Sequence, residues 1–239
     1  MRLIGDLFSI FYWKAVVKWR SLKEERKVKK LYYSDSNFAR CDRALIKAYR
    51  SINPYRVAKE FLKKSGAKET DLYGETYLTA LDQIAKVCHL SEQDQVVELG
   101  CGRGRNAFFL ANRYGCKVKG IDWVPYFIEQ AQKIAQQCSC SRVSFSCENM
   151  HQADLSSATV VYLYGTCLKE EEIIQLAHSF KKLPEGAKII TVSYPLSDYV
   201  SGYVLIEKLT ENFPWGKGDI FLQKVEIPSS EQPFNFRLK

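Results

Sequence analysis

The stretch that decides the fold of this chain is VVELGCGRGRN, Val96 to Asn106. A short apolar run ends in an acid and continues into three glycines at every second position, Gly100, Gly102 and Gly104. Glycines in a turn between a strand and a helix let the backbone approach a ligand closely. The stretch therefore predicts a strand, a ligand-binding turn and a helix.

Strand and helix patterns alternate from this turn almost to the C-terminus. The expected strands are VVELG, VKGID, RVSFSC, VVYLYG, AKIITVSYP and, after a long gap without a helix, GDIFLQKVEI. The expected helices between them are RNAFFLANRYG, PYFIEQAQKIAQQC and LKEEEIIQLAHSFKKL. Apolar strands that alternate with helices indicate a parallel sheet covered on both faces. We expect a Rossmann-like, doubly wound α/β fold with seven strands, mostly parallel with an antiparallel edge strand.

Charge divides the chain of 239 residues into two parts. Residues 1–70 carry 18 Lys and Arg against 7 Asp and Glu, a net charge of +11, whereas the other 169 residues carry 17 against 20, a net charge of −3. We expect a basic helical extension at 1–70, broken near Asn53-Pro54, a ligand-binding domain at 71–227 and a tail at 228–239. A basic arm within residues 1–50 favours an acidic partner or an anionic membrane surface, although a solvated helical face has the same composition.

The first twenty residues permit two interpretations. Apolar residues recur at helical spacing, but Asp6, Lys14 and Lys18 make the segment too short and too charged to span a bilayer. No small-residue cleavage site follows, which argues against a signal peptide. The segment is either a helix packed on the domain or an interfacial membrane helix backed by downstream lysines. A cytoplasmic location, peripheral to a membrane in the second case, is expected.

The eight cysteines and three histidines do not indicate a metal site. No two cysteines form C-x-x-C, and the C-x-C of Cys138 and Cys140 lacks the second pair that a zinc site needs. The histidines are far apart in the sequence. Free cysteines inside apolar runs fit a reducing compartment such as the cytoplasm.

The glycine turn departs from the pattern that binds dinucleotides. Such a turn requires G-x-G-x-x-G, and the place of its third glycine is taken here by Arg105. Glu98, at the end of the strand, would repel a pyrophosphate but would suit the ammonium group of an amino acid.

Polar residues also end the next two expected strands. Asp122 lies 20 residues beyond Gly102, where a carboxylate accepts hydrogen bonds from the hydroxyls of a ribose. Glu148 and Asn149 end the third strand, where a polar pair can bind the amino edge of an adenine. Taken singly, each of these residues is equally typical of a strand that ends in solvent. In this order along one sheet edge, however, sites for an amino acid, a ribose and an adenine indicate S-adenosylmethionine.

These residues resemble the class I S-adenosylmethionine-dependent methyltransferases, whose turn reads E-x-G-x-G-x-G. The resemblance covers about Asp94 to Glu226. A narrower one covers about Tyr73 to Pro195, because LYGETYLTALDQIAKV is similar to the YGE-T loop and following helix of the non-SET histone lysine methyltransferases.

The narrower resemblance implies roles for several residues. Tyr73 and Thr76 would close over the methionine end of the cofactor. Glu98, Gly100 and Asp122 match the acid of the family's turn, its turn glycine and its ribose acid. At the family's carboxylate-binding glutamine this chain has Arg105, which could clamp the carboxylate as an ion pair unless it is a solvated first-turn arginine.

The stretch after the fourth strand departs from the family. Where the family carries Asn-Asn-Phe along its lysine channel, this chain has Tyr164, Gly165 and Thr166. A related group, the mitochondrial lysine methyltransferases, also varies here and carries hydrophobic N-terminal segments. The methyl acceptor therefore stays open at the level of sequence.

The expected activity is methyl transfer to an amine, with a protein lysine as the first candidate. We hypothesise that Tyr164, Tyr194 and Tyr73 build an aromatic channel that orients the amine, although Tyr164 and Tyr194 could equally be packed strand ends. Trp215 is a weaker candidate for the acceptor side. A small-molecule N-, O- or S-methyltransferase that uses the N-terminal helices as a lid is the first alternative, and a non-catalytic cofactor-binding module is the second.

Overall fold

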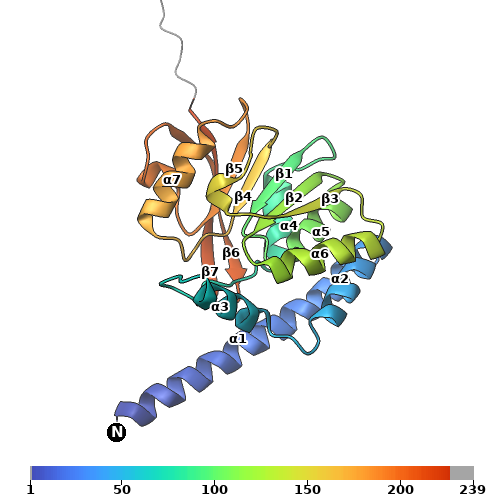
Figure 1. The fold of residues 1–239 in the computed structure, drawn as a ribbon, viewed down its shortest axis with the longest axis vertical. Helices are drawn as coiled ribbons and strands as arrows, with labels where there is room; N and C mark the ends of the chain where they lie inside the picture. Colours follow the sequence, from blue (N-terminus) through green and yellow to red (C-terminus); the bar gives the residue numbers. More distant parts are fainter. Residues whose placement is uncertain (1, 227–239) are drawn as a thin grey trace, which may run out of the picture.

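A seven-stranded mixed sheet forms the centre of the protein (Figure 1). The computed structural model describes residues 2–226, so the expected tail at 228–239 lies outside the described residues. The strands lie in the order β3-β2-β1-β4-β5-β7-β6. Their bounds are β1 Gln95–Leu99, β2 Lys117–Asp122, β3 Val143–Cys147, β4 Val160–Leu163, β5 Lys188–Val192, β6 Tyr203–Phe213 and β7 Gly216–Val225.

The expected fold class is confirmed, with one refinement at an edge of the sheet. Strands β1 to β5 pair in parallel, and β7 pairs antiparallel with both β5 and β6. The antiparallel strand is thus second from the edge, and β6 is the edge strand. No expected strand covered β6, because residues 204–208 are exposed and lack a clear alternation of apolar and polar side chains.

Helices cover both faces of the sheet. Their bounds are α1 Arg2–Tyr32, α2 Ser36–Ala48, α3 Pro54–Lys64, α4 Leu78–Val87, α5 Arg105–Tyr114, α6 Pro125–Gln137 and α7 Glu170–Phe180, with short 3₁₀ turns at η1 Met150–Gln152 and η2 Leu196–Asp198. Because side chains alternate along a strand, Val96 packs under α4, α5 and α6, whereas its neighbour Val97 packs under α7. Two apolar cores result, one on each face.

The N-terminal extension is part of the same fold. Asp35 caps α2, Asn53 caps α3, and Pro54 occupies the first turn of α3, so the helix break near Asn53-Pro54 is confirmed. Phe38 of α2 is fully buried against Phe109 of α5, with ring centroids 5.2 Å apart. α2 therefore shares the core of the domain, and the division at residue 70 stays a prediction.

Helix α1 projects from the body at its N-terminal end and reaches the core at its C-terminal end (Figure 1). Tyr12, Trp13, Trp19 and Leu22 are more than half exposed, whereas Val28 is fully buried. Within residues 2–226, no helix has the length and apolarity needed to cross a membrane. The C-terminal end of α1 thus packs on the domain, whereas residues 12–22 present large apolar side chains to solvent. The interpretation as an interfacial membrane helix stays a prediction.

Candidate active site

The glycine turn is folded tightly over the end of β2. The amides of Gly100 and Cys101 both donate to the Ile121 carbonyl, at 2.8 and 2.9 Å. All three glycines of the turn have positive φ, and a Cβ on Gly104 would lie 2.6 Å from the Phe145 ring. Only glycine tolerates this path without strain. The turn therefore requires glycine for its backbone path and, at Gly104, for its contact with Phe145.

Asp122 is held beside this turn. Its Oδ2 accepts a hydrogen bond from the Gly102 amide at 2.8 Å, and its Oδ1 accepts one from the Val124 amide at 2.9 Å. Burial raises the pKa of Asp122, and these amide hydrogen bonds oppose that rise. Each carboxylate oxygen keeps a second lone pair, so the side chain can still accept hydrogen bonds from a diol.

Glu98 is buried with half of its carboxylate unpaired. The residue is 3% exposed, and its Oε1 accepts a hydrogen bond from Asn106 Nδ2 at 2.7 Å. Its Oε2 has no hydrogen-bond partner among the described residues. Burial raises the pKa of Glu98 to about 8. A buried carboxylate without a partner is costly, and an ammonium group would supply that partner. The residue therefore fits the amino end of S-adenosylmethionine.

A cavity of about 380 Å³ opens at the carboxyl ends of β1, β2 and β4. This volume suits a small-molecule ligand. Seven residues that the sequence analysis assigned to the site line it: Tyr73, Gly100, Gly102, Asp122, Glu148, Asn149 and Tyr164. An adjoining smaller pocket, which shares Gly74, Gly100 and Tyr164 with the cavity, is lined by Thr76, Glu98 and Arg105. The structure thus brings together most residues of the predicted cofactor site.

The expected adenine end lies at the tips of β2 and β3. The backbone amide of Glu148 donates to the Asp122 carbonyl at 3.2 Å. The side-chain carboxylate of Glu148 lies 3.2 Å from Lys119 Nζ. Asn149 caps η1 by accepting from the His151 amide. That contact uses the side-chain oxygen of Asn149 and leaves its amide nitrogen free to contact a base. Recognition of adenine by this pair stays a prediction.

The YGET loop, residues 73–76, lies against both the glycine turn and β4. Thr76 Oγ1 and the Tyr162 hydroxyl are 2.6 Å apart, in a fully buried hydrogen bond. A Cβ on Gly102 would meet the Tyr73 ring at 3.0 Å, and one on Gly74 would meet the Tyr164 ring at 2.7 Å. The two glycines therefore permit ring-to-backbone contact on both sides of the loop.

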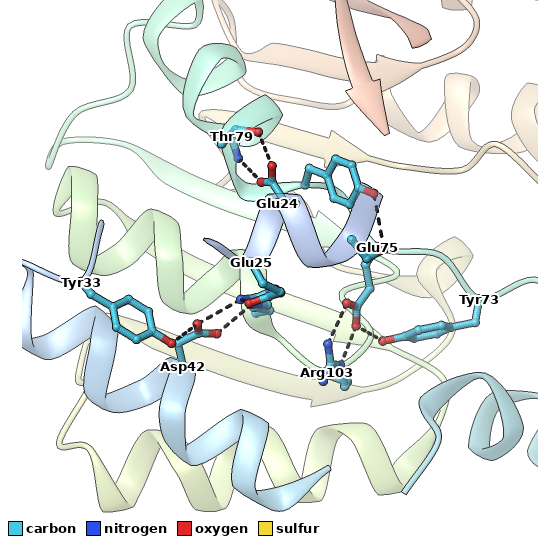
Figure 2. A network of polar contacts seen from close by, with 11 residues as sticks. Glu24, Glu25, Tyr33, Asp42, Tyr73, Glu75, Thr79 and Arg103 are labelled. Carbon is cyan, nitrogen blue, oxygen red and sulfur yellow. Dashed lines mark hydrogen bonds and ion pairs between the residues drawn. The ribbon is translucent and has the colours of Figure 1, made fainter. Parts of the chain in front are cut away.

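The role expected for Arg105 needs correction. Its Nε donates to Asp42 Oδ1 at 2.7 Å, and its Nη1 donates to Glu25 Oε1 at 2.5 Å. Asp42 also accepts a hydrogen bond from the Tyr33 hydroxyl (Figure 2). Two carboxylates from the N-terminal helices thus pair with the guanidinium on its Nε, Nη1 and Nη2 atoms. Arg105 ties α1 and α2 to the first turn of α5, and these contacts replace the expected one with the carboxylate of the cofactor.

The expected aromatic channel also needs correction. Tyr194 does not line the cavity among the described residues; it is buried one layer behind it, and its hydroxyl donates to the Gly165 carbonyl at 3.3 Å. Trp215, ranked lower from sequence, does line the cavity, and its Nε1 donates to the Tyr164 hydroxyl at 2.7 Å. Phe213 stacks on Trp215 with centroids 5.3 Å apart. The aromatic wall therefore consists of Tyr73, Tyr164 and Trp215.

Helix α3 supplies a wall that the sequence analysis did not assign. Ala58 and Leu62 of α3 line the cavity with Leu72 and Trp123. Phe61 packs edge-on against Trp123, with ring centroids 5.4 Å apart. The signal for this wall was the apolar face of α3, which sequence alone cannot place over any particular surface.

Comparison with known proteins agrees with this geometry. Residues 98–201 match the family model described as the ANTKMT methyltransferase domain. Phosphoethanolamine N-methyltransferase 1 of Arabidopsis thaliana is 25% identical over 186 residues, which is 76% of this chain but 33% of that protein. Protein-L-isoaspartate O-methyltransferase of Methanococcus aeolicus is 26% identical over 145 residues, which is 59% of this chain and 64% of that protein. The chain thus spans about a third of the length of the plant relative.

Solved structures share the fold. An RNA methyltransferase from Salinibacter ruber, in complex with S-adenosyl-L-homocysteine, aligns with a TM-score of 0.51 at 23% identity, covering 64% of this chain and 95% of that one. Magnesium protoporphyrin IX methyltransferase from Synechocystis, with bound S-adenosylmethionine, aligns with a TM-score of 0.52 at 15% identity, covering 74% and 99%.

Fold, site and family match together define residues 98–201 as a class I S-adenosylmethionine-dependent methyltransferase domain. S-adenosylmethionine is the cofactor of this class. The resemblance to the non-SET lysine methyltransferases is confirmed as well, because the ANTKMT family is of that type.

Proposed function

We propose that the protein transfers a methyl group from S-adenosylmethionine to an amine, and that this amine is a protein lysine. The match of residues 98–201 to the ANTKMT methyltransferase domain carries the proposal. The cavity supports it, because aromatic side chains and small residues line the end that would receive the acceptor.

The chemistry requires alignment and a neutral nucleophile more than a strong base. The bound cofactor supplies an electrophilic methyl group on a sulfonium, and displacement needs the amine in line with it. An apolar wall favours the neutral amine, since desolvation disfavours the charged form. Burial raises the pKa of Tyr164 to about 12, so its hydroxyl stays protonated at physiological pH. Tyr164 would therefore orient the amine through a hydrogen bond and would not act as a base.

The aromatic wall gives a first prediction about the acceptor. Replacement of Trp215 by Leu removes the donor to the Tyr164 hydroxyl and a ring face that the lysine ammonium can approach before it loses its proton. We expect kcat/KM for the acceptor to fall roughly twofold to thirtyfold, which corresponds to a loss of about 0.5–2 kcal/mol of transition-state stabilisation. The cofactor Kd should change little. Steady-state kinetics with the acceptor varied, together with calorimetric cofactor binding, measure both.

Tyr194→Phe is the matched control, because it removes a similar hydroxyl that lies behind Gly165 and outside the cavity. We expect its transfer rate to stay near that of the wild type. Loss of activity in Tyr194→Phe together with full activity in Trp215→Leu would overturn the assignment of the wall.

Transfer of labelled methyl from S-adenosylmethionine into a lysate of the source cells tests the function directly. Acid-precipitated protein and the soluble fraction are counted separately, beside a Gly102→Asp variant whose carboxylate would stand against Asp122 and the Tyr73 ring. Counts that appear in protein and are recovered as methylated lysine support the proposal. Counts confined to the soluble fraction contradict it.

A small amine is the second candidate acceptor. Ala58 and Leu62 of α3 cover the cavity with apolar surface, as a lid over a small substrate would. The plant relative is named for N-methylation of phosphoethanolamine, a small amine. Both candidates share amine chemistry and differ in which fraction of the lysate becomes labelled. Binding of cofactor without counts in either fraction would instead favour a non-catalytic module.

Residues 12–19 of α1 are the proposed docking surface for an acidic partner or an anionic membrane. Exposed Tyr12, Trp13 and Trp19 lie among the basic residues Lys14 and Lys18. Such a mixture of aromatic and basic side chains suits a peripheral, cytoplasmic attachment.

Deletion of residues 1–19 tests this surface and spares the hydrogen bonds of Ser21 with Tyr77 and of Glu24 with Thr79. We expect the truncated protein to keep its Tm and cofactor Kd but to lose co-sedimentation with anionic vesicles. Deletion of residues 1–50 would be uninformative, because it removes the buried face of α2. Equal sedimentation of the two forms would contradict the membrane interpretation.

A further inference from the structure

Arg103 lies in the middle of the glycine turn and has a partner outside it. Its Nε and Nη2 donate to the two carboxylate oxygens of Glu75 at 2.5 and 2.7 Å, in a bidentate ion pair. Its guanidinium also lies 5.0 Å from the centroid of the Tyr49 ring. The side chains of Arg103 and Glu75 are only 14% and 29% exposed. The pair thus joins the YGET loop to the glycine turn in a partly buried position.

Glu75 also holds the aromatic residue of its own loop. The Tyr73 hydroxyl donates to the carboxylate that receives Arg103 (Figure 2). The Tyr73 ring lies against Gly102, the glycine that precedes Arg103 in the turn. One carboxylate therefore fixes both the ring that covers the turn and the cation within the turn.

The surroundings of Glu75 keep its carboxylate ionised in this ion pair. Burial raises the pKa of Glu75, but Arg103 and the hydrogen bonds from Arg103 and Tyr73 outweigh burial, and the pKa lies below its usual value. A bidentate pair of this kind is stronger and more directional than a single hydrogen bond. Removing one member leaves the other charge partly buried without a partner.

The loop that these contacts fix borders the cofactor site on two sides. Tyr73 and Gly74 line the cavity, and Glu75, Thr76 and Arg103 line the smaller pocket that contains the unpaired carboxylate of Glu98. A ligand that spans both spaces therefore lies against residues 73–76.

We propose that Glu75 and Arg103 are positioning residues for the cofactor: their ion pair holds residues 73–76 closed on the glycine turn, and its opening limits cofactor exchange. The inference rests on the proposed function only through the cofactor and requires no particular methyl acceptor.

The experiment measures dissociation of S-adenosylhomocysteine from the full chain by stopped-flow displacement. We expect Glu75→Gln and Arg103→Gln each to accelerate dissociation by about tenfold to a hundredfold, within the usual range of coupling between two sites. Because both remove the same contact, the double variant should dissociate no faster than the faster single variant. Arg103→Lys, which keeps the charge but not the bidentate geometry, should fall between the wild type and Arg103→Gln.

Asp71→Asn is the matched control, since it breaks an exposed ion pair with Lys59 just before the same loop. Its dissociation rate should equal that of the wild type. Unchanged rates in Glu75→Gln and Arg103→Gln would overturn the proposal. So would acceleration that only parallels a fall in the Tm of the cofactor-free protein, because the pair would then be merely structural. Failure to methylate lysine would leave all these rates unaffected, so the two proposals fail separately.

Discussion

Replacement of Glu98 by Gln should weaken cofactor binding by about 2–5 kcal/mol, or roughly thirtyfold to several thousandfold in Kd. The side chain is buried beside the glycine turn, and its Oε2 has no partner within residues 2–226. An ammonium group would form a charge-assisted hydrogen bond there, and a neutral amide could not replace it. Isothermal titration with S-adenosylmethionine measures the change.

The pKa of Glu98 makes this binding depend on pH. Burial raises it to about 8, so the cofactor-free protein holds a proton there at neutral pH and must release it to bind an ammonium. Below pH 8 we expect affinity to rise by about tenfold per pH unit. Above pH 8 the affinity should fall, since an α-amino group itself loses its proton near pH 8. Glu98→Gln should lack the rise, and an identical pH profile in both proteins would contradict the assignment.

Protonation of Glu98 also makes the stability of the folded protein depend on pH, but in the opposite direction to its affinity for the cofactor. In the unfolded chain the pKa of Glu98 returns to its ordinary value of 4.5, so between pH 4.5 and pH 8 the folded state binds a proton that the unfolded state has lost. Stability of the cofactor-free protein therefore falls as pH rises through this window. Cofactor-free Glu98→Gln should be more stable than the wild type at pH 8 but not at pH 4. A residue kept at the expense of stability is characteristic of a binding site.

Replacement of Arg105 by Ala should destabilise the fold by about 3–5 kcal/mol, because it leaves Asp42 charged, buried and without its cation. The Asp42 side chain is fully buried, whereas Glu25 on the same guanidinium is 36% exposed. Glu25→Gln should therefore cost much less. Urea unfolding at neutral pH measures the series.

A compensating variant separates charge from packing at this site. Asp42→Asn combined with Arg105→Gln removes both charges, and it should recover part of the stability lost in Arg105→Ala. The folded fraction of these variants should bind cofactor nearly as tightly as the wild type. Full stability of Arg105→Ala with a large loss of cofactor affinity would restore the carboxylate clamp expected from sequence.

Features that depend on residues close together in the sequence, or on the order of strands and helices, were predictable from the sequence. Glycine at positions 100, 102 and 104 permits the positive φ found there, and Asp122 reaches the turn because parallel strands bring their carboxyl ends to one edge. The alternation of strands and helices likewise predicts a doubly wound sheet. These inferences need only backbone geometry, apolar periodicity and the order of the elements.

Side-chain partners that are far apart in the sequence were decided by the tertiary structure. Arg105 meets Asp42 and Glu25 across 63 and 80 residues, and Trp215 meets Tyr164 across 51. Tyr194 and Tyr164 both follow strands, yet only Tyr164 reaches the cavity, because Gly165 lies in front of Tyr194. Sequence thus determined the cofactor turn and its sheet, since short-range sterics and periodicity specify them. The partner of each charged or aromatic side chain depends on how the helices pack, which local sequence does not encode.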